Sequence, residues 1–417
     1  MYSFWFMLLI RNNGHANFIS DNTTKATFPY PNRKEEHNRE VKHGNHEKMG
    51  IATTINTAGA ILAYLIGAGF ASGQETMQFF SNWGSVSGCF EIGVIFIVFL
   101  ALTYVGVCYI GRTRNAADIK ALYEVVGGKA GGKLLSFFVW AYNLGCYFFM
   151  ISGFGNVLNQ QFGLPRPIGN AIAVILSVGT ALLGLKKMVD IIGKIGTVVV
   201  GFSLILGIVS AFWTFPQIKD SVALLESGAI TVNRAGHSIL LSAISYTGTC
   251  ILIPMAYVAQ LGHELSPYRE KDTRRIMMLS TLSYGLCCIL LGLNYLGNIA
   301  ECSVAAIPNL VLANHLIGGA GIVFSVIIML AIYSTMCPIL WTCASMLWSN
   351  EKSLPYRAFI VACGVVVYFV VLFIPYEALI NYIMTYFGYA GALSGAVIII
   401  RYFMLKSQDK KAAAEKA

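Results

Sequence analysis

Long apolar segments recur along this chain and decide its fold class. After residue 48 the sequence contains ten of them, each near or above the ~20 residues that a helix needs to cross a bilayer. Only 12% of the residues are charged, about half the share found in soluble domains. The apolar runs are continuous and do not alternate, which argues against a transmembrane β-barrel. The sequence therefore predicts an all-α polytopic membrane protein with ten transmembrane helices.

The predicted spans divide the chain into a ten-helix domain, at about residues 49–406, and two tails. The N-terminal tail, 1–48, has the polar composition of a disordered segment or a non-native extension, and 407–417 forms a C-terminal tail. The spans themselves run at about Gly50–Ser81, Val86–Gly111, Leu134–Phe162, Ile168–Leu185, Val189–Phe215, Ala235–Gly262, Arg275–Gly297, Gly318–Trp348, Tyr356–Ile374 and Tyr376–Phe403.

Lysine and arginine fall almost entirely on one side of this topology. If the N-terminus lies inside, all of the 29 basic residues except Arg166, Lys219 and Arg234 lie in cytoplasmic segments. Such an excess marks the cytoplasmic loops of membrane proteins. We therefore expect a multi-pass protein of the bacterial cell (inner) membrane with both termini in the cytoplasm. The same distribution explains the net charge of +9, so the charge does not indicate a nucleic-acid partner.

The first span contains a stretch that is unsuited to a continuous helix in lipid. Within Ile66–Glu75, three glycines are followed directly by Gln74 and Glu75. Each glycine costs about 1 kcal/mol relative to alanine in a helix, and an ionised carboxylate at membrane depth costs about 2.5–3.5 kcal/mol. Backbone leaves the helical conformation in a membrane only where protein buries it or water reaches it. We therefore expect the span to break at a cavity that forms the functional site.

The sixth span carries a comparable stretch, Ser245–Cys250, followed by Pro254. Proline removes a backbone donor and clashes with the preceding turn. Since spans 1 and 6 are five apart, breaks in both indicate an inverted-repeat transporter with its site at the midplane. The predicted repeats cover about 50–215 and 235–403, with helices 1 and 6 broken at mid-membrane. Close helix packing through small residues is the alternative explanation for each stretch.

The run Gly67–Glu75 resembles the signature of the YkvI-like family of bacterial membrane proteins. The resemblance covers about Met49–Lys406 and places the chain in the amino acid–polyamine–organocation superfamily. It implies the LeuT-type fold. The Gly-x-Gly-x-Phe pattern of that superfamily is matched only in part, because Phe70 follows the second glycine directly. The resemblance does not identify the substrate.

A broken helix offers backbone groups to both ends of a zwitterion. Free amides at the start of an outer half-helix favour an anion, and free carbonyls at the end of an inner half favour a cation. In span 3, an i, i+4 pair lies on one helical face that could line the same site, although helix packing is the commoner role for such a tyrosine. The predicted substrate-binding residues are Gly67, Ala68, Gly69, Asn143, Tyr147, Tyr246, Thr247, Gly248 and Thr249.

Span 8 contains an oxygen-rich patch just before Pro338. In sodium-coupled transporters of the LeuT-type fold, this span supplies a carbonyl and two hydroxyls three and four residues later, facing carbonyls of span 1. The resemblance therefore implies a site for sodium as coupling ion, and no other cofactor is expected. Alternatively, both hydroxyls bond to their own helix near the proline. The implied sodium ligands are Ala63, Ile66, Ala331, Ser334 and Thr335.

Gln74 and Glu75 are predicted to act in gating or proton coupling in the outer half of span 1. Glu75 could attract cations, exchange a proton or pair with a group in an outer vestibule. A structural hydrogen bond to a neighbouring helix is the alternative for this side chain. These possibilities remain open at the level of sequence.

The combined features favour a secondary active transporter of a small, amino-acid-like solute that is coupled to sodium and works by alternating access. The alternatives are a proton-coupled transporter and a membrane receptor that binds a nutrient without moving it. The chain has no Walker loop, no G-x-S-x-G and no H-E-x-x-H motif, so we expect no enzyme activity. The expected partners are the small-molecule solute and the lipid bilayer, with no nucleic acid and no ATPase subunit.

Overall fold

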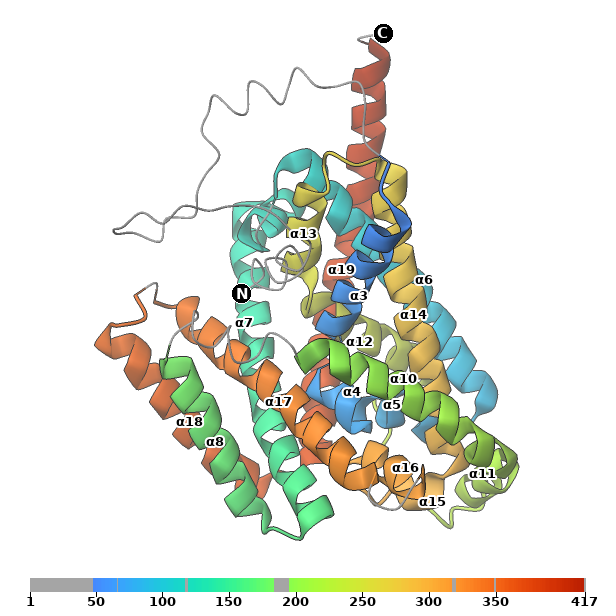
Figure 1. Cartoon of the computed structure of the whole chain (residues 1–417). Helices are drawn as coiled ribbons and strands as arrows, with labels where there is room; N and C mark the ends of the chain where they lie inside the picture. The colour runs from blue at the N-terminus through green and yellow to red at the C-terminus, as the bar shows by residue number, and fades with distance from the viewer. Residues whose placement is uncertain are drawn as a thin grey trace.

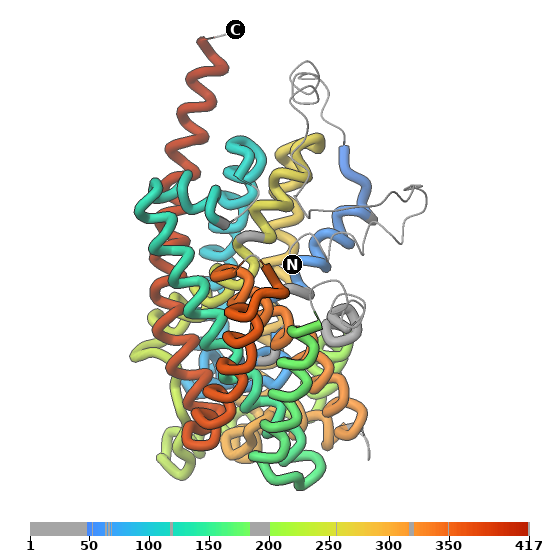
Figure 2. The backbone as a smooth tube through the Cα atoms, turned by 90° about the vertical axis from the view of Figure 1, so that its left-hand side faces the viewer, coloured from blue at the N-terminus to red at the C-terminus, as the bar shows by residue number. Residues whose placement is uncertain are grey.

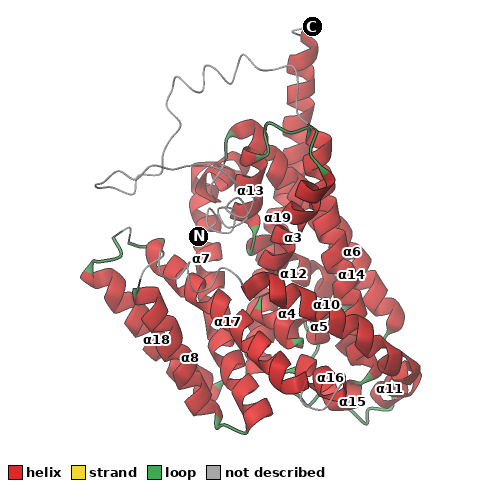
Figure 3. Cartoon of the chain, viewed as in Figure 1, coloured by secondary structure: helices red, strands yellow, loops and turns green. Residues whose placement is uncertain are grey.

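The computed structural model describes residues 48–65, 67–116, 119–183, 195–316, 320–348 and 350–415. Within these ranges every regular element is a helix (Figure 3). The α-helices are α3 (Ile51–Leu65), α4 (Ala68–Ser72), α5 (Gln74–Phe79), α6 (Val86–Arg114), α7 (Ile119–Phe162), α8 (Arg166–Leu182), α10 (Ile195–Thr214), α11 (Ile218–Glu226), α12 (Ile239–Leu252), α13 (Met255–Glu264), α14 (Glu270–Gly297), α15 (Ile299–Cys302), α16 (Pro308–Leu316), α17 (Ala320–Ser345), α18 (Leu354–Phe373) and α19 (Tyr376–Glu415).

Seven helical segments of the described chain are long and apolar enough to cross a membrane, and the bent pair α12–α13 raises this number to eight. The apolar helix α8 is shorter, at 17 residues. The long helices run between two ends of the molecule (Figures 1 and 2). One end carries the C-terminus and is called the C-terminal end below. The opposite end carries α11, α15 and α16 and is called the lid end. The expected all-α polytopic architecture is therefore confirmed.

Two predicted segment boundaries differ in detail from the structure. The predicted C-terminal tail continues α19 as a helix to Glu415. Helix α7 begins at Ile119, well before the predicted start of span 3 at Leu134, and Gly128, with a φ of 71°, interrupts its helical conformation. A glycine adopts this left-handed conformation without the steric penalty that other residues meet. Residues 1–47 and the predicted start of span 5 at residues 189–194 lie outside the described residues.

The helices α12 and α19 approach each other closely through glycines. A Cβ added at Gly248 would collide with the Gly388 carbonyl, and one added at Gly391 would collide with the Gly248 carbonyl. The Ser245 hydroxyl donates a hydrogen bond across this contact to the Thr385 carbonyl at 2.8 Å. Small residues allow such backbone contact between membrane helices. This interface holds α12 firmly against α19.

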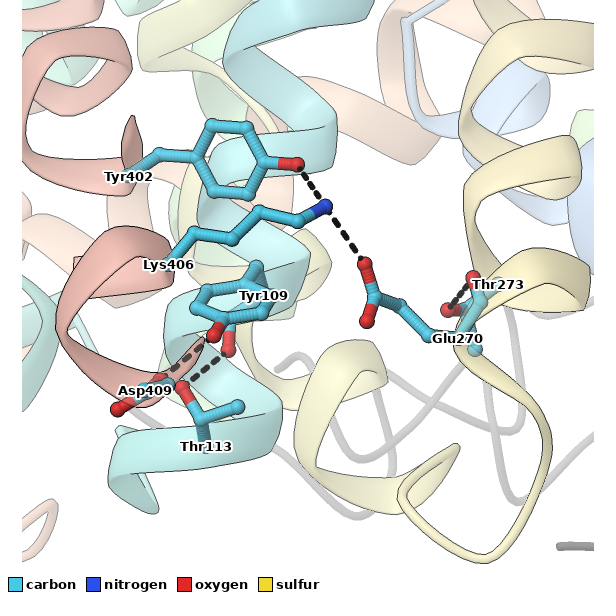
Figure 4. A network of polar contacts seen from close by, with 7 residues as sticks. All are labelled: Tyr109, Thr113, Glu270, Thr273, Tyr402, Lys406 and Asp409. Carbon is cyan, nitrogen blue, oxygen red and sulfur yellow. Dashed lines mark hydrogen bonds and ion pairs between the residues drawn. The ribbon is translucent and has the colours of Figure 1, made fainter. Parts of the chain in front are cut away.

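Charged side chains join α6, α14 and α19 at the C-terminal end (Figure 4). Lys406 Nζ on α19 donates to Glu270 Oε1 at the start of α14, at 2.9 Å. Asp409 accepts a hydrogen bond from the Tyr109 hydroxyl at 2.6 Å and pairs with Arg114 at 2.7 Å. The extension of α19 is thereby attached to both neighbouring helices, in a region where the sequence places basic residues.

Candidate functional site: an interrupted helix beneath a lid

The first span is interrupted where its glycines predict. Helix α3 ends at Leu65, and α4 begins after Gly67, whose φ of −92° and ψ of −169° are extended. The Gly67 amide donates to the Leu65 carbonyl at 3.0 Å, which forms a tight turn. No atom would lie within 4 Å of a Cβ at Gly67, so space is open beside the break. Ile66 lies outside the described residues.

A second interruption follows at Gly73, between α4 and α5. The φ of Gly73 is 90°. A Cβ there would lie 2.6 Å from the Tyr295 hydroxyl and 3.1 Å from the backbone nitrogen of Asn309. Both the conformation and the crowding require glycine at this position. The outer half of span 1 therefore consists of two short helices joined at a sharp corner, a division that the sequence did not predict.

The segment between α14 and α17 covers the outer half of span 1 and is called the lid (298–316). Asn309 Nδ2 donates to the carbonyls of Phe70 and Ala71 on α4, at 3.2 and 2.9 Å. Gln74 Nε2 donates to the Ala305 carbonyl at 2.8 Å. On the other side, the Gln160 amide both donates to and accepts from the Ile307 backbone, at 3.0 and 2.8 Å. Side chains of α5, α7 and the lid itself thus hold the lid against α4, and α16 of the lid lies next to α4 (Figure 1).

Glu75 points back from α5 toward the first break. Its carboxyl lies directly against Gly69, where it leaves no room for a Cβ. Glu75 Oε1 accepts hydrogen bonds from the hydroxyls of Tyr246 at 3.3 Å and Tyr284 at 3.4 Å. The Tyr284 hydroxyl also lies 3.5 Å from the Leu65 carbonyl at the end of α3. Glu75 therefore belongs to the break itself and does not face an outer vestibule.

The predicted break of span 6 is wrong in position. Helix α12 continues through the predicted stretch to Leu252, and the chain bends by 57° before α13. The hydroxyls of Thr247 and Thr249 donate to the carbonyls of Ala243 and Tyr246 in their own helix. The backbone of α12 therefore stays helical at these two threonines. The bend lies at Pro254, since this residue cannot donate to the preceding turn.

The predicted substrate residues of spans 3 and 6 are only partly brought to the break. Of those on α12, Tyr246 reaches it through its hydroxyl, whereas Gly248 faces α19. The Tyr147 hydroxyl is buried and bonds to Ser177 on α8 at 2.7 Å. Asn143 is half-buried one turn earlier on the same face of α7. Helix packing, the alternative considered for this pair, accounts for Tyr147.

The implied sodium ligands lie on α3 and α17, which both pack against α10 but make their largest contacts with different helices. The hydroxyls of Ser334 and Thr335 both donate to the Ala331 carbonyl of α17, at 2.8 and 3.0 Å. Helix α17 packs against α4, whereas α3, which carries Ala63, packs mainly on α14 and α10. The remaining implied ligand, Ile66, falls outside the described residues. The structure thus shows the back-bonded arrangement of the two hydroxyls.

Two residues at the break were not predicted. Tyr284 on α14 binds Glu75, and Asn309 in the lid binds the carbonyls of α4. Neither residue belongs to a motif with recognisable spacing, and their partners are 209 and 238 residues away in sequence. The only available signal was the lid segment as a whole, since its proline and apolar residues suggest a return into the protein.

No protein-family model matches the chain. It is 26% identical over 206 residues to a protein described as uncharacterized membrane protein YkvI of Bacillus subtilis (strain 168). The matched segment makes up 48% of this chain and 55% of that protein, so it spans about half the length of the curated relative. This similarity supports the resemblance to YkvI, a membrane protein that is itself uncharacterized.

Two solved structures resemble this chain over most of its length. Mhp1 in its inward-facing conformation has a TM-score of 0.52 at 14% identity, over 85% of this chain and 77% of Mhp1. MhsT in complex with L-phenylalanine has a TM-score of 0.52 at 14% identity, over 85% of this chain and 89% of MhsT. At this identity the likeness concerns the fold. The chain is a multi-pass membrane protein with the LeuT-type fold.

Proposed function

We propose that this protein is a secondary active transporter of a small, amino-acid-like solute, coupled to sodium and working by alternating access. The observation that carries the proposal is the interruption of span 1 between Leu65 and Ala68, with open space at Gly67 beneath a closed lid. Irregular backbone at membrane depth is found where it lines a cavity. The fold shared with Mhp1 and MhsT supports the proposal.

The backbone of α4 suits the carboxylate of an amino acid. No side chain caps the start of this helix, and Gly67 precedes it without a Cβ. The first amides of α4 can therefore bind an anionic group, while the carbonyls at the end of α3 can bind an ammonium group. The bound L-phenylalanine of MhsT supports this class of solute. In this proposal Gly67, Ala68 and Gly69 form the backbone part of the substrate site.

We also propose ten transmembrane helices in two inverted repeats, with both termini in the cytoplasm. Span 1 consists of α3 with α4 and α5, and α8 supplies one further span, which together with the eight segments described above makes ten. The bent pair α12–α13 corresponds to the interrupted first span, since each opens its half of the chain. In this orientation the lid end faces outward and the C-terminal end faces the cytoplasm.

In this proposal, sodium couples to the transport cycle because all of its ligands come together in only one conformation. Ser334 and Thr335 keep lone pairs while they donate to the Ala331 carbonyl, so they can still bind a cation. The remaining ligands would come from the end of α3, which packs on α14 and α10 here. Sodium would thus bind when α3 approaches α17 and would shift the equilibrium toward that form.

The test begins with thermal unfolding of the purified protein in the presence of single amino acids, with sodium or potassium. A ligand that binds the folded protein raises its stability by mass action. The stabilising compound is then offered, radiolabelled, to proteoliposomes with and without an inward sodium gradient. We expect accumulation that requires the gradient and is lost when Ser334→Ala and Thr335→Ala are combined. Ser325→Ala, on the same helix and also bonded within it, is the matched control.

Two other outcomes separate the rival functions. A compound that stabilises the protein but never accumulates under any ion gradient would contradict transport and indicate a nutrient receptor. Accumulation that follows a pH gradient and ignores sodium would indicate proton coupling. If accumulation still depends on sodium after both substitutions, Ser334 and Thr335 are not sodium ligands, but transport itself is not contradicted.

A further inference from the structure

A buried carboxyl without a basic partner lies behind the break in span 1. Glu75 exposes 7% of its surface. The described residues contain four ion pairs, and none of them involves Glu75. Its hydrogen-bond donors are two neutral phenols, Tyr246 and Tyr284, whose hydroxyls lie 3.1 Å apart. An isolated carboxylate is costly in such surroundings.

The groups that face Glu75 from the neighbouring helices are all phenols and thiols. Along with the two tyrosine donors, Cys250 lies on α12 and Cys288 on α14, while Tyr376 reaches α4 from α19 through Ser72. Tyr142 and Cys146 on α7 interact with it electrostatically at longer range. The described part of the chain thus offers no lysine, arginine or histidine that could balance a negative charge here.

The ligand set at Glu75 fits a proton better than a metal cation. Ca²⁺ and Mg²⁺ take six or more oxygen ligands in a compact shell, and the sodium site implied above has five. Here one carboxyl and two hydroxyls lie at hydrogen-bond distance, and the Leu65 carbonyl and the Cys288 sulfur each lie 3.5 Å from one of the hydroxyls. A proton needs only one carboxyl oxygen, and Glu75 Oε2 is not bonded to either phenol.

We propose that Glu75 is a proton-binding site of the transport cycle, positioned by Tyr246 and Tyr284. This inference rests on the proposed transporter function and adds a second coupling ion to it. One O–H bond forms at the carboxyl when a proton arrives from water, and the same bond breaks when the proton returns to water. Both phenols keep their protons throughout.

The location of Glu75 links this proton to the movement of the helix halves. Its carboxyl contacts α4 at Gly69, and Tyr284 connects it with the Leu65 carbonyl at the end of α3. Displacement of α3 changes the hydrogen bonds available to Tyr284 and opens a path for water to the carboxyl. Protonation and the position of α3 are therefore coupled, because each changes the free energy of the other.

Infrared difference spectroscopy of the protein in lipid nanodiscs tests this site without a solute. Between acidic and alkaline pH, the wild type should show one carbonyl stretch of a buried carboxylic acid that is lost in Glu75→Gln. Glu91→Gln removes a carboxyl from an exposed position and should retain the band. Tyr284→Phe should shift the band frequency, since it removes one hydrogen bond to the carboxyl, an effect that a purely structural role in helix packing would not produce.

The outcomes distinguish this inference from the transport proposal. Identical difference spectra for the wild type and Glu75→Gln would overturn the proton site, as would a Glu75 band that does not change at any pH at which the protein stays folded. If the band titrates but no solute accumulates in proteoliposomes, the transport proposal is contradicted. Glu75 is then a proton-binding site that does not serve transport. If Glu75→Gln does not fold, Tyr284→Phe provides the test: a shift of the band frequency supports the proton site, and an unchanged frequency contradicts it.

Discussion

The two halves of span 1 are held in very different ways. All six residues of α5 are buried, and α4 is bonded to the lid, to α19 and to its own turn. Helix α3 is exposed in its first turns and packs mainly on α14, as Figure 1 shows. Two side-chain hydrogen bonds join it to α14, one from Ser280 to the Ala58 carbonyl at 3.4 Å and one from Tyr284 to the Leu65 carbonyl at 3.5 Å. Because α4 and α5 are held by more elements than α3, we expect α3 to be the part of span 1 that moves in the proposed transport cycle.

The largest expected effect separates the two glycines that border α4. Gly73→Ala places a side chain in a left-handed conformation and against the Tyr295 hydroxyl, so it should destabilise the protein by about 2–4 kcal/mol. Gly67→Ala is the matched control, because its backbone is extended and space is open beside it. Denaturant unfolding of both variants measures the difference. Equal losses of stability would contradict the fixed outer half.

A smaller effect is expected when the lid is released from α4. Asn309→Ala leaves the Phe70 and Ala71 carbonyls without this donor, and the loss of one or two net hydrogen bonds corresponds to about 1–2 kcal/mol. Amide hydrogen exchange in α4 and α5 should become roughly tenfold faster, approaching that of α3. Asn159→Ala, whose amide bonds only within its own turn at Leu164, is the control. Unchanged exchange in α4 would show that the lid does not hold it.

The smallest expected effect concerns a contact inside the lid. Glu301 lies 2.6 Å from His315 Nε2, and the hydrogen bond from His315 holds the pKa of Glu301 below its usual value. A lowered carboxyl pKa contributes stability above the unfolded-state pKa, and this contribution disappears as the pH falls through the folded-state pKa. Both side chains are about half exposed, so the contribution is about 0.5 kcal/mol or less. Unfolding of wild type and His315→Gln should differ near neutral pH and converge in acid; a constant difference would contradict this origin.

The helical architecture and the first break were predictable because both depend on local composition. Apolar length determines a membrane helix, and the glycines at 67, 69 and 73 lie next to one another in sequence. The span 6 break was misplaced because threonine hydroxyls can bond to their own helix, whereas only Pro254 lacks a donor. The partners of Glu75 were not predictable in detail, since Tyr246 and Tyr284 meet it only after distant helices pack together.

Distances measured by electron–electron double resonance between spin labels test alternating access most directly. One pair joins Thr53 on α3 to Met346 after α17, and the other joins Val304 in the lid to Phe162 at the end of α7. All four positions are exposed, and labels carried by non-canonical amino acids leave the native cysteines intact. A third pair at Leu240 and Leu393, across the α12–α19 interface, is the control. Sodium should shorten the first distance, lengthen the second and leave the third unchanged. Changes of the same sign at both ends, or none at either, would contradict alternating access with a mobile inner half.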